Sequence, residues 1–365
     1  MNHLNKILQS DMDYISNSLR EELDMLSGKK ILLTGGAGFL GYELTHLFSQ
    51  VGFEDGRKSI DLTVYDNFSR GSKQWLKNLS NKSNVSLIRH DITKPIPDNA
   101  PDFDYIIHAA SIASPIYYRQ FPIETIDANV NGLRNLLDYA SKRADLDKPI
   151  LSMLYFSTSE IYGNPSHDAI PTSETYRGFV SCTGPRACYD ESKRLGETLC
   201  VNFAQQFDVP VKMARPFNNY GPGLDINDKR VIPDFARNIL TYEDIVILSD
   251  GNTTRTFCYV ADAICGYMKV LIKGRSGEPY NIGVDSPEIS MRELAEKIAK
   301  TGRKIFDYKG KVVYHTSDDT NYLVDNPNRR CPDISKASNE LGYTPKISIE
   351  EGLKRSLLWY KDNQE

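Results

Sequence analysis

Short apolar segments alternate with longer segments of helical periodicity along most of the chain. The apolar segments are predicted strands, and they lie at residues 30–34, 61–65, 85–89, 104–108, 151–157 and 211–215. Between them, apolar residues recur every three or four positions, as at 40–48, 123–142 and 189–207, which predicts amphipathic helices. This alternation favours an α/β fold of the Rossmann type, a doubly wound parallel sheet with helices on both faces.

The pattern also suggests how the chain is divided. Residues 1–28 carry apolar side chains at helical spacing from Leu4 to Leu26, which predicts an amphipathic helical extension docked on the body or on a partner subunit. Residues 29–222 form the predicted Rossmann domain. Beyond residue 222 the periodicity is broken by proline and glycine, so residues 223–365 are interpreted mainly as a smaller C-terminal α/β substrate-binding lobe, with some segments returning to the main domain.

Composition excludes several classes of protein. The net charge of -4 gives no electrostatic footprint for nucleic acid, and no apolar run is long enough to span a membrane. The six cysteines include no Cys-x-x-Cys pair and no cluster with histidine, which argues against a metal site and a disulfide framework. The acidic N-terminal segment is not a signal peptide, so we expect a reducing, cytoplasmic location.

The first predicted strand runs directly into a glycine-rich turn. Gly35, Gly38 and Gly41 follow residues 30–34 and precede a helical pattern. Such a loop lets the backbone approach a pyrophosphate closely and points the N-terminus of a helix at the phosphates. An isolated glycine triplet is also found in ordinary tight turns, but the strand before it and the helix after it predict a dinucleotide site.

An acidic residue closes the second predicted strand. Asp66 lies about 25 residues beyond the last glycine, where a carboxylate accepts both ribose hydroxyls of the adenosine and repels a 2′-phosphate. This position favours NAD over NADP, although Arg70 is close enough to weaken the preference. Asp91 follows the third strand and is a candidate for the adenine edge, with a solvated turn acid as the alternative.

Unusual residues gather after the later strands. They occupy 109–115 after the fourth strand, 157–163 after the fifth and 215–222 after the sixth. Ligands of open α/β sheets bind beyond the carboxyl ends of the strands. The functional site is therefore predicted at this edge of the sheet.

Tyr189 and Lys193 lie four residues apart near the start of a predicted helix. This spacing places both side chains on one helix face. A phenol titrates near pH ~10, so it acts as a base at neutral pH only when a neighbouring cation favours the phenolate. Lys193 is the candidate for that cation, and an ordinary surface pair is the alternative interpretation.

Four motifs together resemble a known family. They are Gly35 to Gly41, the triplet Thr158-Ser159-Glu160, Tyr189-x-x-x-Lys193, and residues 215–222. They resemble the extended short-chain dehydrogenases, the NAD-dependent epimerase/dehydratase family that modifies nucleotide sugars. From residue 29 to the end, segments 66–68, 108–115, 184–194 and 325–334 are most similar to the UDP-glucuronic acid decarboxylases, or UDP-xylose synthases.

The chain departs from this family near the expected sugar site. Arg177 replaces a usual tryptophan, and Ser181-Cys182-Thr183 replaces a usual Asn-Pro-Ile. The substrate sugar is therefore open to change. The additional positive charge of Arg177 either binds a second charged group of the substrate or lies in solvent.

The resemblance implies a mechanism. Tyr189 takes the proton of the sugar C4 hydroxyl while hydride passes to the nicotinamide, and Lys193 holds the cofactor ribose and lowers the phenol pKa. Thr158 or Ser159 steadies the hydroxyl and the forming ketone. The 4-keto acid then loses carbon dioxide, and return of the hydride gives UDP-xylose. Glu160 is the expected acid or base at C5, with a pKa raised in a closed site; a structural carboxylate is the alternative.

The resemblance also implies the remaining contacts. The expected cofactor-binding residues are Gly35, Gly38, Phe39, Leu40, Gly41, Asp66, Asn67, Asp91, Ile92, Ala109, Ala110, Asn129, Tyr189, Lys193 and Pro216. Arg186 and Arg255 are candidates for the substrate carboxylate and diphosphate, since guanidinium groups bind such oxyanions bidentately, and which arginine binds which group is open. Asn218, Arg230 and Arg330 are expected to face the nucleotide, and Tyr118 is expected to face the sugar. A homodimer through helices 123–142 and 189–207 is expected.

Three other functions remain open. A 4,6-dehydratase acting on GDP-mannose or dTDP-glucose shares the first oxidation and then eliminates water. A 4-epimerase needs only rotation of the keto-sugar and no acid at position 160. A non-catalytic NAD-binding sensor or scaffold would not need Thr158, Tyr189 and Lys193, whose presence argues against it.

Overall fold

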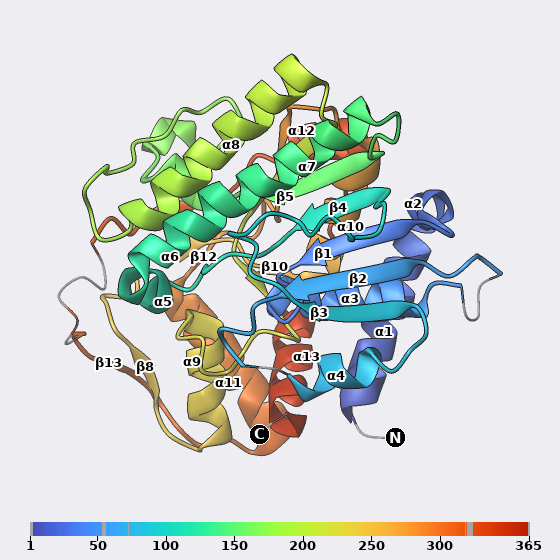
Figure 1. Ribbon diagram of the computed structural model, residues 1–365. Coiled ribbons are helices and arrows are strands. Elements are labelled where there is room, and N and C mark those ends of the chain that lie inside the picture. Colours follow the sequence, from blue (N-terminus) through green and yellow to red (C-terminus); the bar gives the residue numbers. More distant parts are fainter. Residues whose placement is uncertain (1–2, 53–55, 72, 318, 320–323, 364–365) are drawn as a thin grey trace.

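The centre of the protein is a parallel β-sheet (Figure 1). The computed structural model describes residues 3–52, 56–71, 73–317, 319 and 324–363. Within these residues the sheet has seven strands, all paired in parallel, in the order β11-β6-β5-β4-β1-β2-β3. The strands are β1 (Lys30–Thr34), β2 (Asp61–Asp66), β3 (Val85–Arg89), β4 (Tyr105–His108), β5 (Ser152–Phe156), β6 (Val211–Pro216) and β11 (Pro279–Ile282). The predicted Rossmann-type fold is confirmed.

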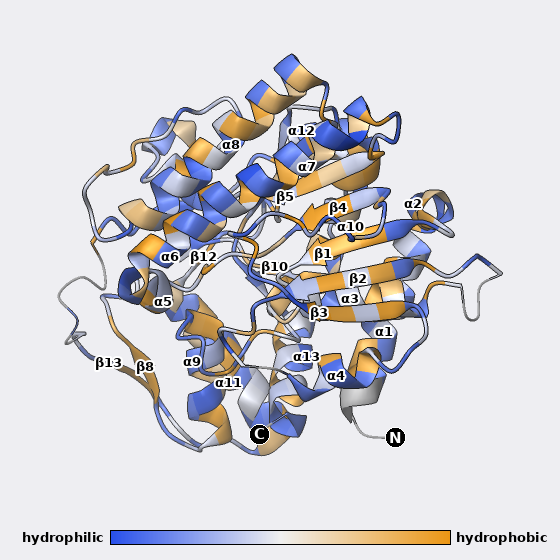
Figure 2. Ribbon diagram, in the orientation of Figure 1, coloured by the Kyte–Doolittle hydropathy of each residue, from blue (hydrophilic) through white to orange (hydrophobic). Residues whose placement is uncertain are grey.

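Helices cover both faces of this sheet because its strands are apolar on both sides, as Figure 2 shows. Side chains of β1 alternate between two cores. Ile31 and Leu33 join the core formed with α3 (Phe39–Gln50) and α10 (Val260–Lys273). Leu32 joins the core of the opposite face, which is formed with α7 (Leu133–Asp145) and α8 (Ala187–Phe207).

The N-terminal extension consists of two helices, whereas the sequence predicted one. They are α1 (His3–Ser18) and α2 (Arg20–Leu26), and residues 1 and 2 of the predicted helix lie outside the described residues. The break falls at Leu19, whose φ of -120° is not helical. Leu19 is fully buried, so the break keeps its side chain in the core.

The first helix packs against its own chain. α1 contacts α10 and α13 (Ile349–Asp362). Asp11 of α1 accepts a hydrogen bond from the hydroxyl of Tyr259 at 2.7 Å and forms an ion pair with Arg355 at 2.5 Å. These polar contacts fix the orientation of α1 on its apolar packing surface, and they hold the first and last helices of the described chain together.

The helix predicted at 123–142 also differs from expectation. The chain forms α6 (Pro122–Asp127), a π-helical turn at Ala128–Gly132, and then α7. The turn points Asn129 inward, where it bonds the hydroxyls of Ser111 and Ser192. Such π-helical turns are common at functional sites, and apolar periodicity alone does not reveal them.

The later segments build a smaller lobe and also return to the main sheet. Elements after residue 222 include α9 (Val231–Leu240), β8 (Ile245–Ile247), β9 (Thr254–Arg255), β12 (Ile289–Ser290), α11 (Met291–Phe306), β13 (Val312–Tyr314), β14 (Arg329–Arg330), α12 (Ser335–Leu341) and α13. Of these, α9, β8, α11 and β13 pack against one another, whereas α12 packs against β11 and α10. The sequence predicted that some segments after residue 222 return to the main domain without saying which, and β11 does so by pairing with β6 at one edge of the central sheet. Its four residues begin with proline, a weak signal for a buried strand.

The remaining elements are short. They are α4 (Gln74–Leu79), α5 (Pro115–Gln120), β7 (Asn219–Tyr220), β10 (Cys258–Tyr259) and the 3₁₀ turns Ser159–Tyr162 and His167–Ala169. Of these, α5 and the turn at 159–162 lie beyond the carboxyl ends of β4 and β5. They therefore bring the predicted site residues together.

Three further properties concern the described residues as a whole. None of their helices combines the length and apolarity needed to cross a membrane. They contain no group of three or more His, Cys, Asp or Glu side chains arranged for a metal ion. All six cysteines are free thiols.

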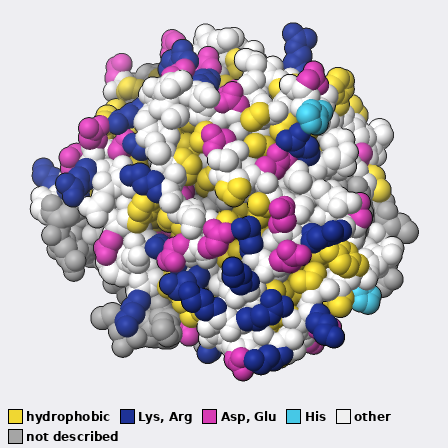
Figure 3. Space-filling view, turned by 180° about the vertical axis from the view of Figure 1, so that it is seen from behind, with side chains coloured by type: hydrophobic (Ala, Val, Ile, Leu, Met, Phe, Trp, Pro, Cys, Tyr) yellow, Lys and Arg dark blue, Asp and Glu magenta, His cyan; other side chains and the backbone are white. Residues whose placement is uncertain are grey.

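Viewed from behind, the surface mixes positive and negative side chains, with the blue side chains of Lys and Arg more frequent toward the lower edge (Figure 3).

Candidate active site

The glycine loop packs tightly against the end of β4. Gly35 has a φ of +73°, and a Cβ there would lie 2.6 Å from the backbone of Ala110. Gly38 caps α3 without a side-chain hydrogen bond, so the first N–H groups of the helix face the loop. A Cβ on Gly41 would lie 2.3 Å from the carbonyl of Gly36. The loop is therefore a backbone cradle that fits a pyrophosphate.

Asp66 is fixed at the rim of this cradle. Its two carboxylate oxygens accept the backbone N–H groups of Ala37 at 2.9 Å and Phe68 at 2.7 Å. Burial raises the pKa of Asp66, and these two hydrogen bonds act in the opposite direction. Arg70 forms an ion pair with Asp228 at 3.2 Å. The guanidinium of Arg70 is therefore engaged by a carboxylate, which favours NAD over NADP.

Replacing Asp66 by asparagine is expected to weaken NAD binding about 10-fold to 100-fold, because charge-assisted hydrogen bonds contribute roughly 1.5–3 kcal/mol. The ratio of NAD affinity to NADP affinity should fall as well. Titration calorimetry with both cofactors measures the change. Asp61→Asn is the control, because Asp61 is exposed at the other end of the same strand. NAD affinity within twofold of wild type would contradict the assignment.

The other predicted cofactor residues lie along the same edge. Phe39 and Leu40 begin α3, and Ala109 and Ala110 follow β4; Pro216 ends β6. Ile92 is buried against Gly132, and Asn67 accepts the N–H of Ser69 in a turn.

Asp91 is exposed. Its Oδ1 accepts the N–H and hydroxyl of Thr93 at 3.0 and 2.9 Å. This geometry is that of a turn acid, and its adenine contact stays a prediction.

Tyr189 and Lys193 occupy the first turns of α8, and both side chains are buried. Burial raises the pKa of the Tyr189 phenol to about 12, and the nearby side chain of Thr158 acts in the opposite direction. Burial lowers the pKa of Lys193 to about 7. Its Nζ donates to the carbonyl of Phe156 at 2.7 Å and lies 5.9 Å from the centre of the Tyr189 ring.

The phenol pKa is therefore raised rather than lowered, with burial as the largest cause, and the effect of Lys193 on it stays a prediction. The positive charge of Arg230 lowers the pKa of Tyr189. The lysine ammonium is itself destabilised by burial. A sequence pattern gives the spacing of two side chains but not their desolvation.

Glu160 lies among arginines. Its Oε2 accepts Nη2 of Arg186 at 2.5 Å and Nη2 of Arg330 at 3.0 Å. Burial raises the pKa of Glu160, but the charges of Arg330, Arg186 and Arg255 outweigh burial and lower it to about 2. The expected raised pKa is thus wrong for this state, because the sequence did not show that two arginines from distant segments converge on one oxygen.

The remaining predicted substrate residues surround this cluster. Tyr118 stacks on Tyr189 with ring centres 5.0 Å apart, and its buried hydroxyl has no hydrogen-bond partner. Arg255 donates to the carbonyls of Thr254, Pro327 and Asn328, so it shapes the loop before β14.

Three further side chains complete the placement. Arg230 pairs with Asp228 at 2.9 Å, and Asn218 bonds the carbonyl of Thr256. The backbone carbonyl of Ser159 accepts Nη1 of Arg330.

Arg177, the departure from the family pattern, has an exposed side chain. Its backbone carbonyl accepts a hydrogen bond from Arg194 at 2.8 Å. The structure therefore favours the solvent interpretation for the additional cation.

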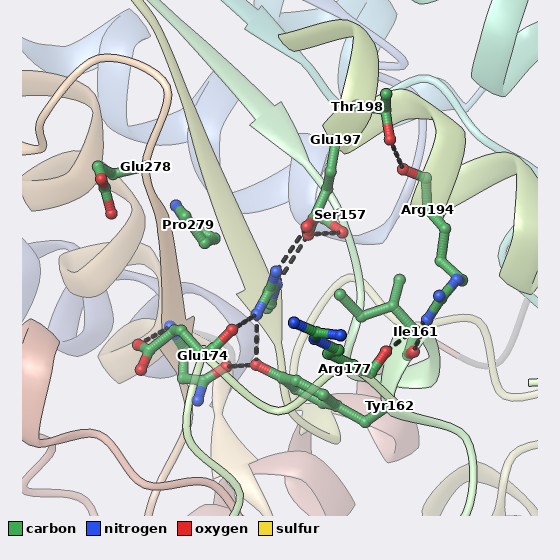
Figure 4. A network of polar contacts seen from close by, with 12 residues as sticks. Ser157, Ile161, Tyr162, Glu174, Arg177, Arg194, Glu197, Thr198, Glu278 and Pro279 are labelled. Atoms are coloured by element: carbon green, nitrogen blue, oxygen red, sulfur yellow. Dashed lines mark hydrogen bonds and ion pairs between the residues drawn. The ribbon is translucent and has the colours of Figure 1, made fainter. Parts of the chain in front are cut away.

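A buried network that the sequence did not predict includes Tyr162, the last residue of the turn Ser159–Tyr162 (Figure 4). Arg215 binds both oxygens of Glu197 at 2.8 and 2.6 Å and donates to the hydroxyl of Tyr162 at 2.7 Å. Ser157 donates to the same glutamate at 2.5 Å. The network ties β5, β6 and α8 together, and it positions the turn that carries Thr158.

Sequence reasoning also missed two buried acids. Asp190 is 4% exposed, and its pKa is raised to about 7, chiefly by burial and then by the charge of Glu160. Asp228 is 1% exposed and pairs with Arg70 and Arg230. The i,i+4 spacing from Arg186 to Asp190 signals an ion pair, whereas no local pattern marks Asp228.

A dinucleotide cradle beside a buried tyrosine and lysine on a Rossmann sheet defines an enzyme of the short-chain dehydrogenase class. The profile of the "NAD dependent epimerase/dehydratase family" matches residues 31–283. The chain belongs to this NAD-dependent family, and NAD is its cofactor.

Curated and solved relatives agree with this assignment. The chain is 38% identical to "UDP-glucuronic acid decarboxylase 6" of Arabidopsis thaliana over 92% of this chain and 90% of that protein. It resembles an epimerase structure from Methanothermobacter thermautotrophicus with a TM-score of 0.78 at 26% identity, covering 95% and 96% of the two chains. It also resembles an NAD complex of dTDP-glucose 4,6-dehydratase from Bacillus anthracis, with a TM-score of 0.74 at 25% identity, covering 92% and 98%.

Proposed function

We propose that the protein decarboxylates UDP-glucuronate to UDP-xylose with NAD. The observation that carries the proposal is the pair Arg186 and Arg330, whose side chains are 12% and 1% exposed and converge on Glu160. Arg186 also lies over the ring of Tyr118, which stacks on Tyr189. Buried guanidinium groups are suited to a carboxylate, and a uronate sugar has one. The name of the Arabidopsis relative supports the same substrate.

In the proposed reaction, the residues of the active site act on the sugar. Tyr189 takes the proton of the C4 hydroxyl, and Thr158 or Ser159 steadies that hydroxyl and the forming ketone by hydrogen bonding. When bound, NAD supplies a reversible oxidant for C4. The resulting 4-keto sugar is a β-keto acid, so its carboxyl bond breaks with the electrons delocalised into the ketone, and carbon dioxide leaves. Glu160, from the turn after β5, donates the proton that C5 gains in place of the carboxyl group. Return of the hydride to C4 and of the proton from Tyr189 to the C4 oxygen then gives UDP-xylose.

Arg330, predicted to face the nucleotide, is thus reassigned to the sugar carboxylate, and the other contacts keep their predicted assignments. Lys193 holds the cofactor ribose, and Asp66 binds the adenosine ribose. Tyr118 faces the sugar. Arg255 and Arg230 lie on the nucleotide side, and Arg255 acts mainly by ordering residues 326–328, whose carbonyl and amide oxygens it binds. The lobe after residue 222 carries the nucleotide, and the domain before it carries NAD.

The proposal includes a homodimer in a cytoplasmic compartment. Apolar side chains are exposed on the outer faces of α6 and α8, including Ile123 at 64%, Ile126 at 38% and Leu195 at 46%. Exposed apolar residues on neighbouring helices suit a two-fold helical interface. The six free thiols suit a reducing compartment.

Product analysis tests the reaction. Purified protein with NAD and UDP-glucuronate is expected to release carbon dioxide and a UDP-pentose, identified by mass spectrometry and NMR. GDP-mannose and dTDP-glucose are run in parallel. Loss of water from either hexose with glucuronate untouched would assign a 4,6-dehydratase, and a UDP-hexuronate inverted at C4 would assign an epimerase.

A further inference from the structure

The arginine cluster around Glu160 carries one more positive than negative group. Arg186, Arg255, Arg329 and Arg330 face three carboxyl groups, Glu160, Asp190 and Glu288. Mutual compensation within the cluster is therefore incomplete. Buried charges are stable only when paired, so the cluster has room for one additional anion.

Some polar atoms of this cluster also lack a hydrogen bond, although Nε of Arg186 lies 3.6 Å from Oδ2 of Asp190 in an ion pair. Nε of Arg186, Nε of Arg330, Oδ1 of Asp190 and the hydroxyl of Tyr118 are buried without a hydrogen-bond partner. Native proteins rarely leave such atoms unpaired. Three of the four are able to donate a hydrogen bond, which is the requirement for binding an anion.

Glu160 binds Arg186 and Arg330 in the way that the carboxylate of a bound ligand would. A single oxygen, Oε2, receives Nη2 of both Arg186 and Arg330. These arginines come from the start of α8 and from β14, 26 and 170 residues away in sequence. Glu160 itself is on a short 3₁₀ turn and is 23% exposed, so it is the most accessible member of the contact.

We propose that Glu160 occupies, in the substrate-free protein, the place that the sugar carboxylate takes on Arg186 and Arg330, and that the incoming carboxylate displaces it. The inference rests on the proposed function and deepens it. The internal carboxylate satisfies the two arginines while the site is empty. A sugar without a carboxylate leaves this ion pair in place.

Displacement changes the chemistry of Glu160. In the substrate-free site the arginines hold its pKa low against the effect of burial. Once the sugar carboxylate has taken over these guanidinium groups, burial and the nearby Asp190 act on Glu160 with less opposition, and its pKa rises. The side chain becomes able to hold a proton only after substrate has bound. Proton transfer by Glu160 at C5 therefore requires that the substrate carboxylate, the group lost as carbon dioxide, is bound.

Binding to a turnover-blocked protein tests the exchange. In NAD-loaded Tyr189→Phe, the additional change Glu160→Gln is expected to tighten UDP-glucuronate about 10-fold, because no internal carboxylate competes. Affinity for UDP-xylose, which lacks the carboxylate, should change less than twofold. Titration calorimetry measures both. Weaker UDP-glucuronate binding, or equal tightening of both nucleotides, would overturn the inference.

Glu288→Gln is the matched control for loss of negative charge. Glu288 binds Arg329, the neighbour of Arg330, at 2.9 and 2.6 Å and does not contact Arg186 or Arg330. Glu288→Gln should change the affinities for UDP-glucuronate and UDP-xylose by the same factor. If Glu288→Gln selectively raised the affinity for UDP-glucuronate as much as Glu160→Gln does, the loss of any nearby negative charge would explain the result. The proposed exchange would then be rejected.

A measurement on protein with Glu160 intact covers the case in which the glutamine variant folds poorly. Calorimetry of Tyr189→Phe in two buffers of different ionisation enthalpy at pH 7 is expected to show proton uptake with UDP-glucuronate and none with UDP-xylose. Equal uptake, or none with either, would reject the exchange. Failure of the proposed function is distinct, because wild-type protein would then form no UDP-pentose in the product assay.

Discussion

Tyr189→Phe is expected to lower kcat by about 10²-fold to 10⁴-fold, the usual contribution of a positioned acid or base. The variant removes one oxygen and keeps the ring that stacks on Tyr118 at 5.0 Å. Substrate binding should therefore change little, and the loss should appear in kcat rather than KM. Steady-state kinetics with UDP-glucuronate measures both constants.

The stacked neighbour supplies the comparison. Tyr118→Phe removes a hydroxyl from the same ring pair but not the predicted base, so it should raise KM more than it lowers kcat. A tyrosine with a pKa near 12 in the free protein is protonated at neutral pH, and it needs additional positive charge in the complete complex to act as a base. If Tyr189→Phe kept kcat within tenfold of wild type, Tyr189 would not be the base.

Lys193→Met is expected to stabilise the cofactor-free protein while lowering kcat/KM by at least about 100-fold. Burial lowers the pKa of Lys193 from 10.5 to about 7. At about 1.4 kcal/mol per pKa unit, holding this charge in the folded protein costs roughly 3–5 kcal/mol. The lost hydrogen bond to Phe156 offsets about 1 kcal/mol, so the net gain at neutral pH is roughly 2–4 kcal/mol.

The sign of the pH dependence follows from where each state holds the proton. Below pH 7 the lysine is charged in both the folded and unfolded protein, so the full cost is present. Between pH 7 and 10.5 the folded lysine is neutral while the unfolded one is still protonated, so wild-type stability rises with pH. The advantage of Lys193→Met should therefore shrink from pH 6.5 to 9.5. Urea unfolding at both pH values measures it.

Lys212 provides a matched control outside the active site. Burial lowers its pKa to about 8, and its Nζ donates to the hydroxyl of Ser152 and the carbonyl of Leu271. Lys212→Met should show a smaller stability change of the same sign with activity retained. Loss of stability in Lys193→Met at pH 6.5 would contradict the assigned pKa.

The strands could be predicted from sequence because each is a local apolar run in a sheet buried on both faces. β1, with all but its first residue buried, is such a case. The glycine loop was predictable for a similar reason, since its spacing is a local requirement of the backbone. β11 was missed because four residues that begin with proline give no period.

The ion pairs of the site could not be predicted, because they join segments far apart in the chain. Arg330 lies 170 residues from Glu160, and no spacing rule relates them. The raised pKa expected for Glu160 was reasonable for a buried carboxyl alone. It failed because charge at close range outweighed desolvation. The presence of the site residues was thus visible in the sequence, whereas their electrostatic state required the fold.

The contact between α1 and α13 has a consequence for synthesis on the ribosome. Asp11 and Arg355 are 344 residues apart. The apolar face of α1, with Met12 and Ile15 at its centre, is among the first surfaces of the described chain to be made. Its partner α13 is among the last. Throughout elongation this stripe lacks part of its burial site, so the nascent chain presents a binding surface to chaperones until α13 has left the exit tunnel.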